Sequence, residues 1–304
     1  MQPNNSKYRD KSREPSYTVA EPTTLLPFLL ATLKGKSRNN VKSLLSRKLV
    51  TVDGKPTSQF DTPLDPGQVV TILSVFVLGC TAPKQDTLPF PILFEDGHLI
   101  VVNKPAKLLS VGNEKEKVRT AYHMVTDYVK SQHIDNRIFV IHRLDRDTSG
   151  VLMFAKDEAT KELFQSRWND IVTRRGYLAV VEGTPRPERD TIHTYLVETK
   201  THMIFSGDPG PGAKEAITNY EVIKSGSGYS LLDISIDTGR KNQIRVHMKE
   251  RGCPIAGDKQ YDARTNPIGR LCLHANELSF THPATGQPTT FKAKMPRDFN
   301  RVFR

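Results

Sequence analysis

The stretch that most constrains this chain is HRLDRDTSG, residues 142–150, which lies between two short apolar runs. These runs, at residues 137–141 and 151–155, have the length and the Val, Ile and Phe content of buried strands. A hairpin between them would need only about two to five turn residues, whereas this stretch carries one histidine, two arginines and two aspartates. One interpretation is a solvated loop in which Asp145 pairs with Arg143 or Arg146. The other is that the charges take part in a reaction.

The composition favours a folded protein with a polyanionic partner. A chain of 304 residues is long enough for two domains, and its 37% of hydrophobic residues can build a core. Lys and Arg number 44 against 33 Asp and Glu, which gives a net charge of +11 and a pI near 9.5. Such an excess points most often to nucleic acid, but charge alone does not identify the partner.

Cysteine and hydropathy patterns indicate the compartment. Cys80, Cys253 and Cys272 form an odd set without CxxC spacing, so we expect no disulfide framework and a reducing compartment. Cys272 with His274 and His282 could be imagined as zinc ligands, but buried thiols and scattered histidines are commoner, and we expect no metal. No apolar run is long enough to span a membrane and the first twenty residues are polar, so the expected location is the cytoplasm.

Composition also divides the chain into four segments. We expect a flexible basic tail at residues 1–20, a small domain at 21–78, a linker with three prolines at 79–91 and a larger domain at 92–304. In the larger domain, the patterns predict strands at residues 92–94, 98–102, 177–181, 191–197, 216–223 and 229–236, and helices at residues 120–132, 157–168 and beyond 238. The expected fold class is therefore α+β.

The small domain has a strongly basic helix. Helical spacing appears at residues 24–33 and 38–48, and short strands are predicted at 49–52 and 69–73. Residues 34–48 contain six Lys and Arg but no acidic residue, so phosphate contact explains them better than pairing along a solvated helix. The basic side chains that can share one side of this helix are Arg38, Lys42 and Arg47.

Three ordered motifs resemble the RluA family of RNA pseudouridine synthases. They are HRLDRDTSGVLMFAK from residue 142, RGYLAVVEG from 175 and TGRKNQIRVHMKERGCPIAGDKQYDA from 238. The similarity includes FEDGHLIVVNKP from residue 94 and AKEAIT from 213, and it runs from about residue 88 to the C-terminal region. The basic helix and the hairpin VTVDGK that follows it are similar to the alpha-L RNA-binding domain.

The resemblance implies a fold and a reaction. The fold would be an N-terminal alpha-L domain linked to a mixed, mainly antiparallel β-sheet domain, with a central cleft that holds Asp145. The reaction would isomerise uridine to pseudouridine in structured RNA, without metal, ATP or organic cofactor. Large-subunit ribosomal RNA is the expected substrate and transfer RNA the second choice, because members with an alpha-L domain usually act on the former. No protein partner is implied.

Carried over residue by residue, the resemblance assigns the site. Asp145 becomes the essential carboxylate, Tyr177 the active-site tyrosine and Arg245 the basic partner of the aspartate. Arg143 would help to expel the target base from its stack. The remaining expected RNA contacts are Arg240, Arg38, Lys42 and Arg47.

These residue types suit the chemistry. Detaching uracil leaves positive character on the sugar and negative charge on the base, so an ionised carboxylate near C1′ stabilises the former. Asp145 could attack C1′, attack the uracil ring or take a proton from C2′. A guanidinium such as Arg245 would keep a buried Asp145 charged, and Tyr177 offers a face for stacking the detached ring.

Two positions depart from the family pattern, and two other functions compete. Lys107 stands where the family commonly has Gly, and Asn242 where it commonly has His, which bears on RNA contacts and not on the reaction. A non-catalytic ribosome assembly factor would keep the fold for docking, but an intact Asp145, Tyr177 and Arg245 argue against it. A carboxylate-pair glycosidase would need an acid partner that no comparable motif supplies.

Overall fold

A computed structural model describes residues 15–33, 38–46, 49–72, 88–114, 116–199 and 201–303. It divides into two compact units, residues 1–85 with 130–135 and residues 86–129 with 136–304. They are called here the N-terminal unit and, after the catalytic residues that the sequence leads us to expect in it, the catalytic unit. Within the described ranges, no helix is long and apolar enough to cross a membrane.

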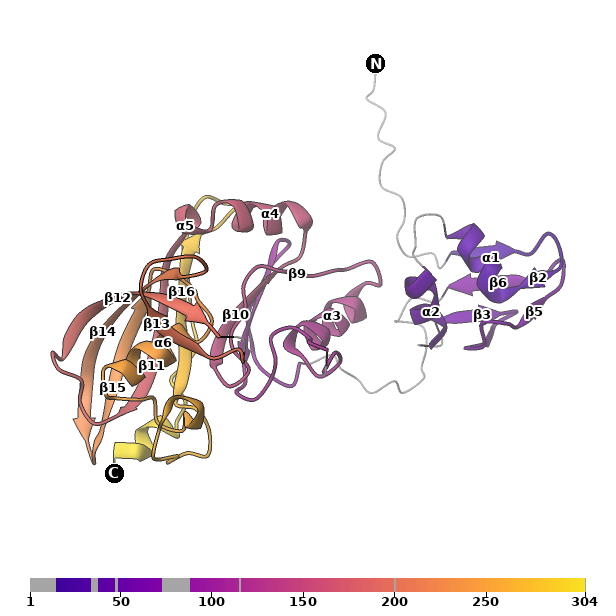
Figure 1. Cartoon of the computed structure of the whole chain (residues 1–304). Helices are drawn as coiled ribbons and strands as arrows, with labels where there is room; N and C mark the ends of the chain where they lie inside the picture. Colours follow the sequence, from indigo (N-terminus) through magenta and orange to yellow (C-terminus); the bar gives the residue numbers. More distant parts are fainter. Residues whose placement is uncertain are drawn as a thin grey trace, which may run out of the picture. The chain divides into compact units, whose positions relative to one another are not determined.

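The N-terminal unit packs two helices against a small sheet (Figure 1). The helices are α1 (Leu25–Thr32) and α2 (Arg38–Ser46). The sheet has the order β1 (Ser16–Thr18), β6 (Val69–Ile72), β3 (Val50–Val52) and β4 (Lys55–Pro56), and β2 (Thr23–Thr24) pairs separately with β5 (Pro63–Leu64). Leucines and valines at helical and alternating spacing build its core, as the sequence predicts.

One boundary of the predicted tail is wrong. Ser16–Thr18, which we assigned to the flexible tail, form strand β1 against β6, and the neighbouring Val19 is buried in the core. The three-residue strand is too short for its alternation to stand out from the polar residues before it. By contrast, the expected hairpin VTVDGK is present, and its turn residues Asp53 and Gly54 both have positive φ, as a tight two-residue hairpin requires.

The catalytic unit is built on one large mixed sheet (Figure 1). Within the described residues, all its strand pairs are antiparallel except β10 with β16. The order is β13 (Ile204–Gly207), β12 (Arg189–Glu198), β14 (Lys214–Gly226), β15 (Tyr229–Ile236), β11 (Val172–Glu182), β16 (Leu273–Thr281), β10 (Ser149–Ala155), β8 (Leu99–Lys104) and β7 (Ile92–Glu95), with β17 (Pro288–Lys292) beside β16 and β9 (Phe139–Val140) beside β10.

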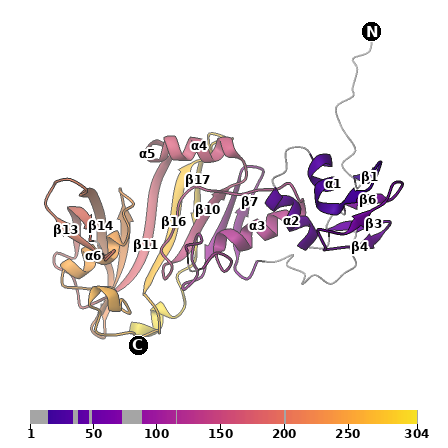
Figure 2. The ribbon, with the colours of Figure 1, turned by 45° about the vertical axis from the view of Figure 1, so that its right-hand side comes forward.

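The helices of this unit follow the predictions with one break. They are α3 (Ala121–Gln132), α4 (Glu158–Ser166), α5 (Trp168–Ile171) and α6 (Gln243–Glu250). Asp157 caps α4 by accepting a hydrogen bond from the Thr160 N–H. The predicted helix at residues 157–168, however, ends at Arg167, and α5 starts there and leads straight into β11 (Figure 2).

Two strand predictions fail for opposite reasons. Residues 137–141 were expected as a buried strand, but only the half-buried Phe139–Val140 pair with β10. Strand β16 was not predicted, although it lies between β11 and β10 near the middle of the sheet. Its sequence LHANELSFT mixes polar residues into both alternating sets, so no period-2 pattern marks it.

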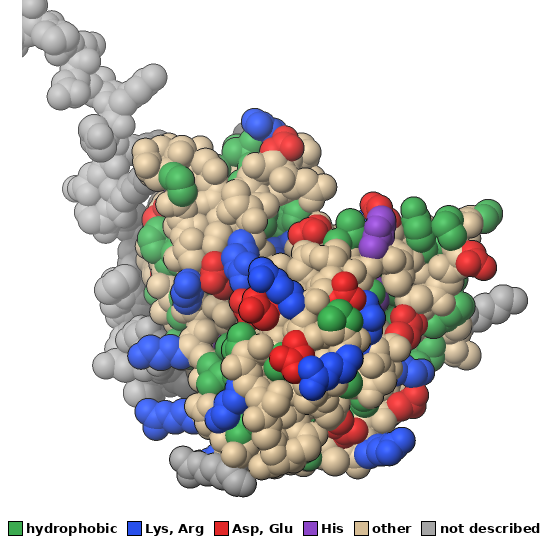
Figure 3. All heavy atoms as spheres, turned by 90° about the vertical axis from the view of Figure 1, so that its left-hand side faces the viewer, with side chains coloured by type: hydrophobic (Ala, Val, Ile, Leu, Met, Phe, Trp, Pro, Cys, Tyr) green, Lys and Arg blue, Asp and Glu red, His purple; other side chains and the backbone are tan. Residues whose placement is uncertain are grey.

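The face of the molecule seen in Figure 3 shows basic and acidic side chains interspersed rather than one basic patch. On the sheet, basic side chains are likewise paired with acidic ones, such as Arg174 with Asp233 and Arg189 with Glu221. Charges that neutralise one another attract a polyanion weakly.

Candidate active site

The motif at residues 142–150 forms an extended loop whose end is fixed by close backbone packing. Ser149 and Gly150 begin β10 and pair with His274 and Ala275 of β16, the parallel pair of the sheet. Gly150 has φ +118°, and a Cβ there would lie 2.0 Å from the Ala275 carbonyl oxygen. Only glycine fits this approach, which explains the last letter of the motif.

Two buried side chains hold the loop on either side of Asp145. The Ser110 hydroxyl donates to the Leu144 carbonyl at 2.6 Å and accepts from the Leu144 N–H at 3.0 Å. The Lys104 ammonium donates to the Arg146 carbonyl at 3.1 Å. Because the residues before and after Asp145 are both fixed, the position of its backbone is set by packing rather than by a flexible turn.

Lys104 is a functional candidate that sequence reasoning missed. It is fully buried, and its Nζ also donates to the carbonyls of Pro105 and Leu108. Burial lowers the pKa of Lys104 to about 7, against the opposing charges of Asp147 and Asp145, and the three carbonyl acceptors also favour the ammonium form. The available signal was a lysine two residues after the apolar run LIVV.

Asp145 carries an unpartnered carboxylate into the cavities of this unit. Among the described residues, no hydrogen bond or ion pair is made by its side chain. Burial raises the pKa of Asp145, while the charges of Arg245, Lys104, Lys241 and Arg143 act in the opposite direction. A carboxylate with free lone pairs and several cations at longer range can act on a ligand.

Tyr177 lies on β11 beside an irregularity of the sheet. Against β16, the register shifts between Gly176 and Leu178, and such bulges redirect side chains next to functional sites. Tyr177 packs against two hydrophobic clusters of the catalytic unit. Burial raises its pKa to about 12, with the Asp145 charge acting in the same direction, so the phenol stays protonated at neutral pH. It therefore offers an aromatic ring and a hydroxyl donor.

Two cavities meet at these residues. Their volumes are about 660 and 90 Å³, and both are lined by Asp145, Tyr177, Arg143 and Arg240. The structure thus brings together four of the site residues that the sequence predicted. The larger volume lies within the range of small-ligand sites and has room for a nucleotide.

Arg245 also lines the smaller cavity, but its predicted ion pair with Asp145 is wrong. Its guanidinium binds Asp258 through two hydrogen bonds of 2.7 Å, from Nε to Oδ2 and from Nη2 to Oδ1. Within the described ranges no ion pair joins it to Asp145, which it affects only at longer range. The motif shows that an arginine and an aspartate are present, but loop packing decides which aspartate it meets.

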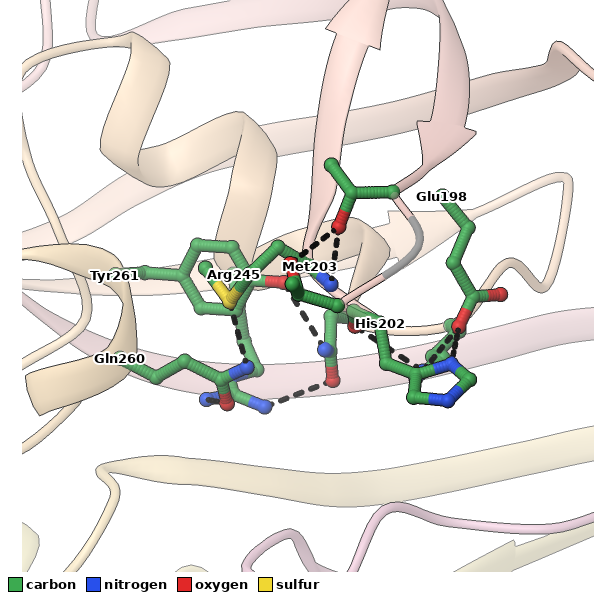
Figure 4. Close-up of polar contacts among 10 residues, drawn as sticks. Glu198, His202, Met203, Arg245, Gln260 and Tyr261 are labelled. Carbon is green, nitrogen blue, oxygen red and sulfur yellow. Dashed lines mark hydrogen bonds and ion pairs between the residues drawn. The ribbon is translucent and has the colours of Figure 1, made fainter.

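Further contacts fix the Arg245 guanidinium in place. Nη1 donates to Asn242 Oδ1 and Nη2 to Gln260 Oε1, and Cζ lies 4.7 Å from the ring centroid of Tyr261. Figure 4 shows Arg245 beside Tyr261. Gln260, which accepts from Arg245, donates in turn to the sulfur of Met203. Asn242 has φ +56°, a conformation that asparagine tolerates better than most residues. The departure from the family's usual histidine therefore leaves a residue that holds Arg245.

The other departure lies at a strained backbone position. Lys107 has φ +66°, in the left-handed region that favours glycine. The glycine common in the family at this point therefore matches the backbone, and the lysine keeps the conformation at some cost. Lys107 lies outside both cavities that Asp145 lines.

The three residues that we considered as zinc ligands have other surroundings. Cys272 is buried, which raises its pKa to about 12, and the His274 ring bonds to Ser149 at 2.9 Å. His282 lies 3.0 Å from Asp96. In the part of the chain that the structure describes, no group of three or more His, Cys, Asp and Glu could hold a metal ion.

The predicted RNA contacts of the N-terminal unit are only partly visible. Arg38 and Lys42 are exposed on α2, four residues apart and therefore on one side of the helix. Arg47 lies outside the described residues, as do residues 79–87 of the predicted linker and Cys80.

Comparisons with known proteins identify the family. A family model of RNA pseudouridylate synthases matches residues 98–250, about half of the chain. Ribosomal large subunit pseudouridine synthase D of Zymomonas mobilis is 31% identical over 291 residues, which cover 88% of this chain and 89% of the relative. Ribosomal large subunit pseudouridine synthase C of Rickettsia bellii is 32% identical over 226 residues, 73% of each chain.

A solved structure supports the fold. Human RNA pseudouridylate synthase domain containing 4 matches with a TM-score of 0.57 and 24% identity, covering 69% of this chain and 90% of that one. The α+β architecture with a large, mainly antiparallel sheet is thereby confirmed, as is the family that the three motifs predicted. The chain belongs to the RluA family of RNA pseudouridine synthases, and it is an isomerase that makes pseudouridine in RNA.

Proposed function

We propose that this enzyme modifies large-subunit ribosomal RNA and that Asp145 is its essential carboxylate. The observation that carries the second part is the unpartnered carboxylate of Asp145 in a cavity that it shares with Tyr177. Support for the first part comes from relatives named as ribosomal large subunit pseudouridine synthases, one of which matches almost the whole chain. Transfer RNA is the second candidate substrate.

The geometry supports a division of roles. The Asp145 carboxylate, whose charged form the surrounding cations favour against the effect of burial, stabilises positive character at C1′ while the glycosidic bond breaks. The ring of Tyr177 stacks the detached uracil, and its protonated hydroxyl stays available as a donor. Arg245 acts indirectly, by fixing α6 and the loop of Asp258 beside the smaller cavity.

Two basic side chains would guide the RNA strand. Arg143 is exposed next to Asp145 and can occupy the gap left by a uridine that leaves its stack. Arg240 is exposed as well, and its Nε already donates to the Glu215 carbonyl, which leaves its terminal nitrogens for phosphate. In the N-terminal unit, we propose that α2 and the hairpin of β3 and β4 bind RNA as an alpha-L domain does.

The test maps pseudouridine in both RNA classes. A strain that lacks the gene should lose one or a few pseudouridines of the large-subunit RNA and no transfer RNA site. The wild-type gene should restore them and Asp145→Asn should not, and the purified Asp145→Asn protein should form no detectable product on the same RNA. Loss confined to transfer RNA would overturn the ribosomal assignment, and product made by a clean Asp145→Asn preparation would overturn the role of the carboxylate.

A further inference from the structure

The larger cavity has a second wall that the proposed reaction does not use. It is formed by His142, Trp168 and Arg175, which line the cavity together with Asp145 and Tyr177. Arg175 precedes Tyr177 by two residues on β11, so the two side chains share one face of the sheet, about 7 Å apart along the strand. A group bound at Arg175 would therefore lie beside a uridine bound at Tyr177.

Arg175 is a partly buried cation without an ion pair. Its Cζ lies 5.9 Å from the ring centroid of Trp168, and a Cβ on Gly239 would come within 2.9 Å of its Nη1. In the described part of the chain no carboxylate lies within ion-pair distance of it, and Asp237 acts on it only at longer range. Burial lowers the pKa of Arg175. An unpaired cation in such a place is unfavourable unless a ligand supplies the anion.

His142 adds a neutral donor to the same wall. Its Nε2 accepts a hydrogen bond from the Met153 N–H, and burial together with the Arg175 charge lowers its pKa to about 4. At neutral pH the ring is therefore uncharged and carries its proton on Nδ1. The ring centroid lies 5.6 Å from that of Trp168, and Nδ1 has no partner among the described residues. The wall thus presents donors from Arg175 and His142 beside an aromatic ring.

We propose that this wall binds the phosphodiester next to the target uridine, with Arg175 on Trp168 as the principal contact and His142 Nδ1 as a second donor. A phosphate accepts hydrogen bonds and donates none, which matches a wall of donors, and its charge supplies the anion that Arg175 lacks. The aromatic ring supports the guanidinium through a cation–π contact. This subsite rests on the proposal that Asp145 and Tyr177 hold the target uridine in the same cavity.

The chain offers an internal reporter, because Trp168 is its one tryptophan. The full-length wild-type protein is titrated with the uridine trinucleotide UpUpU while Trp168 fluorescence is followed. A second titration uses the trinucleotide with uncharged methylphosphonate linkages. We expect a saturable change with UpUpU and an affinity roughly tenfold to a hundredfold lower for the uncharged analogue, the usual loss when one charge-assisted hydrogen-bond group is removed.

Two adjacent arginines give a matched pair of variants. Arg175→Gln should weaken UpUpU binding and should lose most of the preference for the charged trinucleotide, with a remainder from Arg240 and His142. Arg174 is the next residue back on β11 and points to the opposite face, where it pairs with Asp233 and Glu277. Arg174→Gln should therefore keep the preference of the wild type for the charged trinucleotide.

The outcomes decide the proposal without depending on one variant. If Arg175→Gln fails to fold, Arg175→Lys and the two wild-type titrations still apply, and the lysine should keep part of the charge preference. Equal binding of the two trinucleotides by the wild type, or no saturable response to UpUpU, overturns the phosphate subsite. Equal binding would mean that the wall contacts a nucleobase. These are binding results, so they are distinct from a failure of Asp145→Asn to abolish product, which would overturn the role of the carboxylate instead.

Discussion

Two aspartates lie within electrostatic reach of Arg245, and the protein uses them in opposite ways. Asp258 has a side chain that is 2% exposed, and it receives two hydrogen bonds of 2.7 Å from the guanidinium. Asp145 faces the cavities and feels Arg245 only at a distance. Both carboxylates are largely removed from bulk water, and only one has its lone pairs satisfied.

This difference separates a structural carboxylate from the one that we propose to be reactive. A buried carboxylate that is paired and hydrogen-bonded holds its surroundings together, and removing one partner is costly. An unpaired carboxylate bears the cost of burial without that compensation, which is the usual state of a group kept for chemistry. Raised pKa and missing partners at Asp145 are two signs of the same condition.

The largest effect on stability should come from breaking the ion pair between Arg245 and Asp258. Arg245→Ala strands the Asp258 carboxylate and should lower the free energy of unfolding by about 3–5 kcal/mol, as expected for half of a buried pair. Urea unfolding measures this loss in the free energy of unfolding. Lys249→Ala serves as the control, since Lys249 is on the same helix and its pair with Asp262 is exposed, which limits its effect to at most about 1 kcal/mol. An Arg245→Ala protein as stable as the control would mean that the pair is not buried.

A pH-dependent effect is expected from Lys104, the buried cation near Asp145. Its pKa is about 7 in the folded protein and 10.5 as its ordinary value, so between these values the unfolded chain holds a proton that the folded one has lost. The wild type should therefore gain stability relative to Lys104→Met as pH rises from about 7 to about 10, by at most about 1.4 kcal/mol per pH unit. A difference that stays constant over this range would place the pKa near its ordinary value.

A smaller effect is predicted for the pH dependence of the reaction. Because burial raises the pKa of Asp145 above its ordinary value of 3.8, its carboxylate should be lost by protonation at a less acidic pH than usual. The rate at saturating RNA should then fall on the acid side with a pKa above 3.8. Single-turnover rates measured across the acid range test this expectation. A rate that falls with a pKa at or below 3.8 would contradict the buried environment of Asp145.

The smallest effect is expected in the N-terminal unit, which is far from either aspartate in sequence. If α2 binds phosphates, replacing Arg38 and Lys42 by alanine should flatten the slope of log affinity against log salt by about 1.4 to 1.8, which is two phosphate contacts. The rate at saturating RNA should change little, because these residues make no differential contact with the transition state. A collapsed saturating rate with an unchanged slope would refute the RNA-binding role of this unit.

The sequence marked residues 142–150 as the candidate active-site loop because the information in this motif is local. The three motifs singled out Asp145, Arg143, Tyr177 and Arg240. In the structure these four residues line the same two cavities. The glycine that ends the motif is explained by the backbone of a strand 125 residues later, which no local pattern shows. Strand β16 was therefore missed together with the reason for Gly150.

The partner of Arg245 could not be predicted for a related reason. Asp258 lies 13 residues after Arg245, within the same motif, and the fold of the loop between them decides the pairing. Lys104 and Ser110 likewise act on a loop about forty residues away in sequence, and only the structure places them on either side of Asp145. Residue types at a site are readable from a motif, whereas the pairing of charges depends on tertiary contacts.

Comparing Asp145→Asn with Asp258→Asn in two assays, product formation and urea unfolding, tests whether the two aspartates have different roles. We predict that Asp145→Asn makes no detectable product and unfolds at the same or a higher urea concentration, because the amide removes a charge that burial disfavours. Asp258→Asn should lose about 3–5 kcal/mol of stability and still make product under conditions where it is folded. An active Asp145→Asn, or one destabilised as much as Asp258→Asn, would contradict the division of roles between the two aspartates.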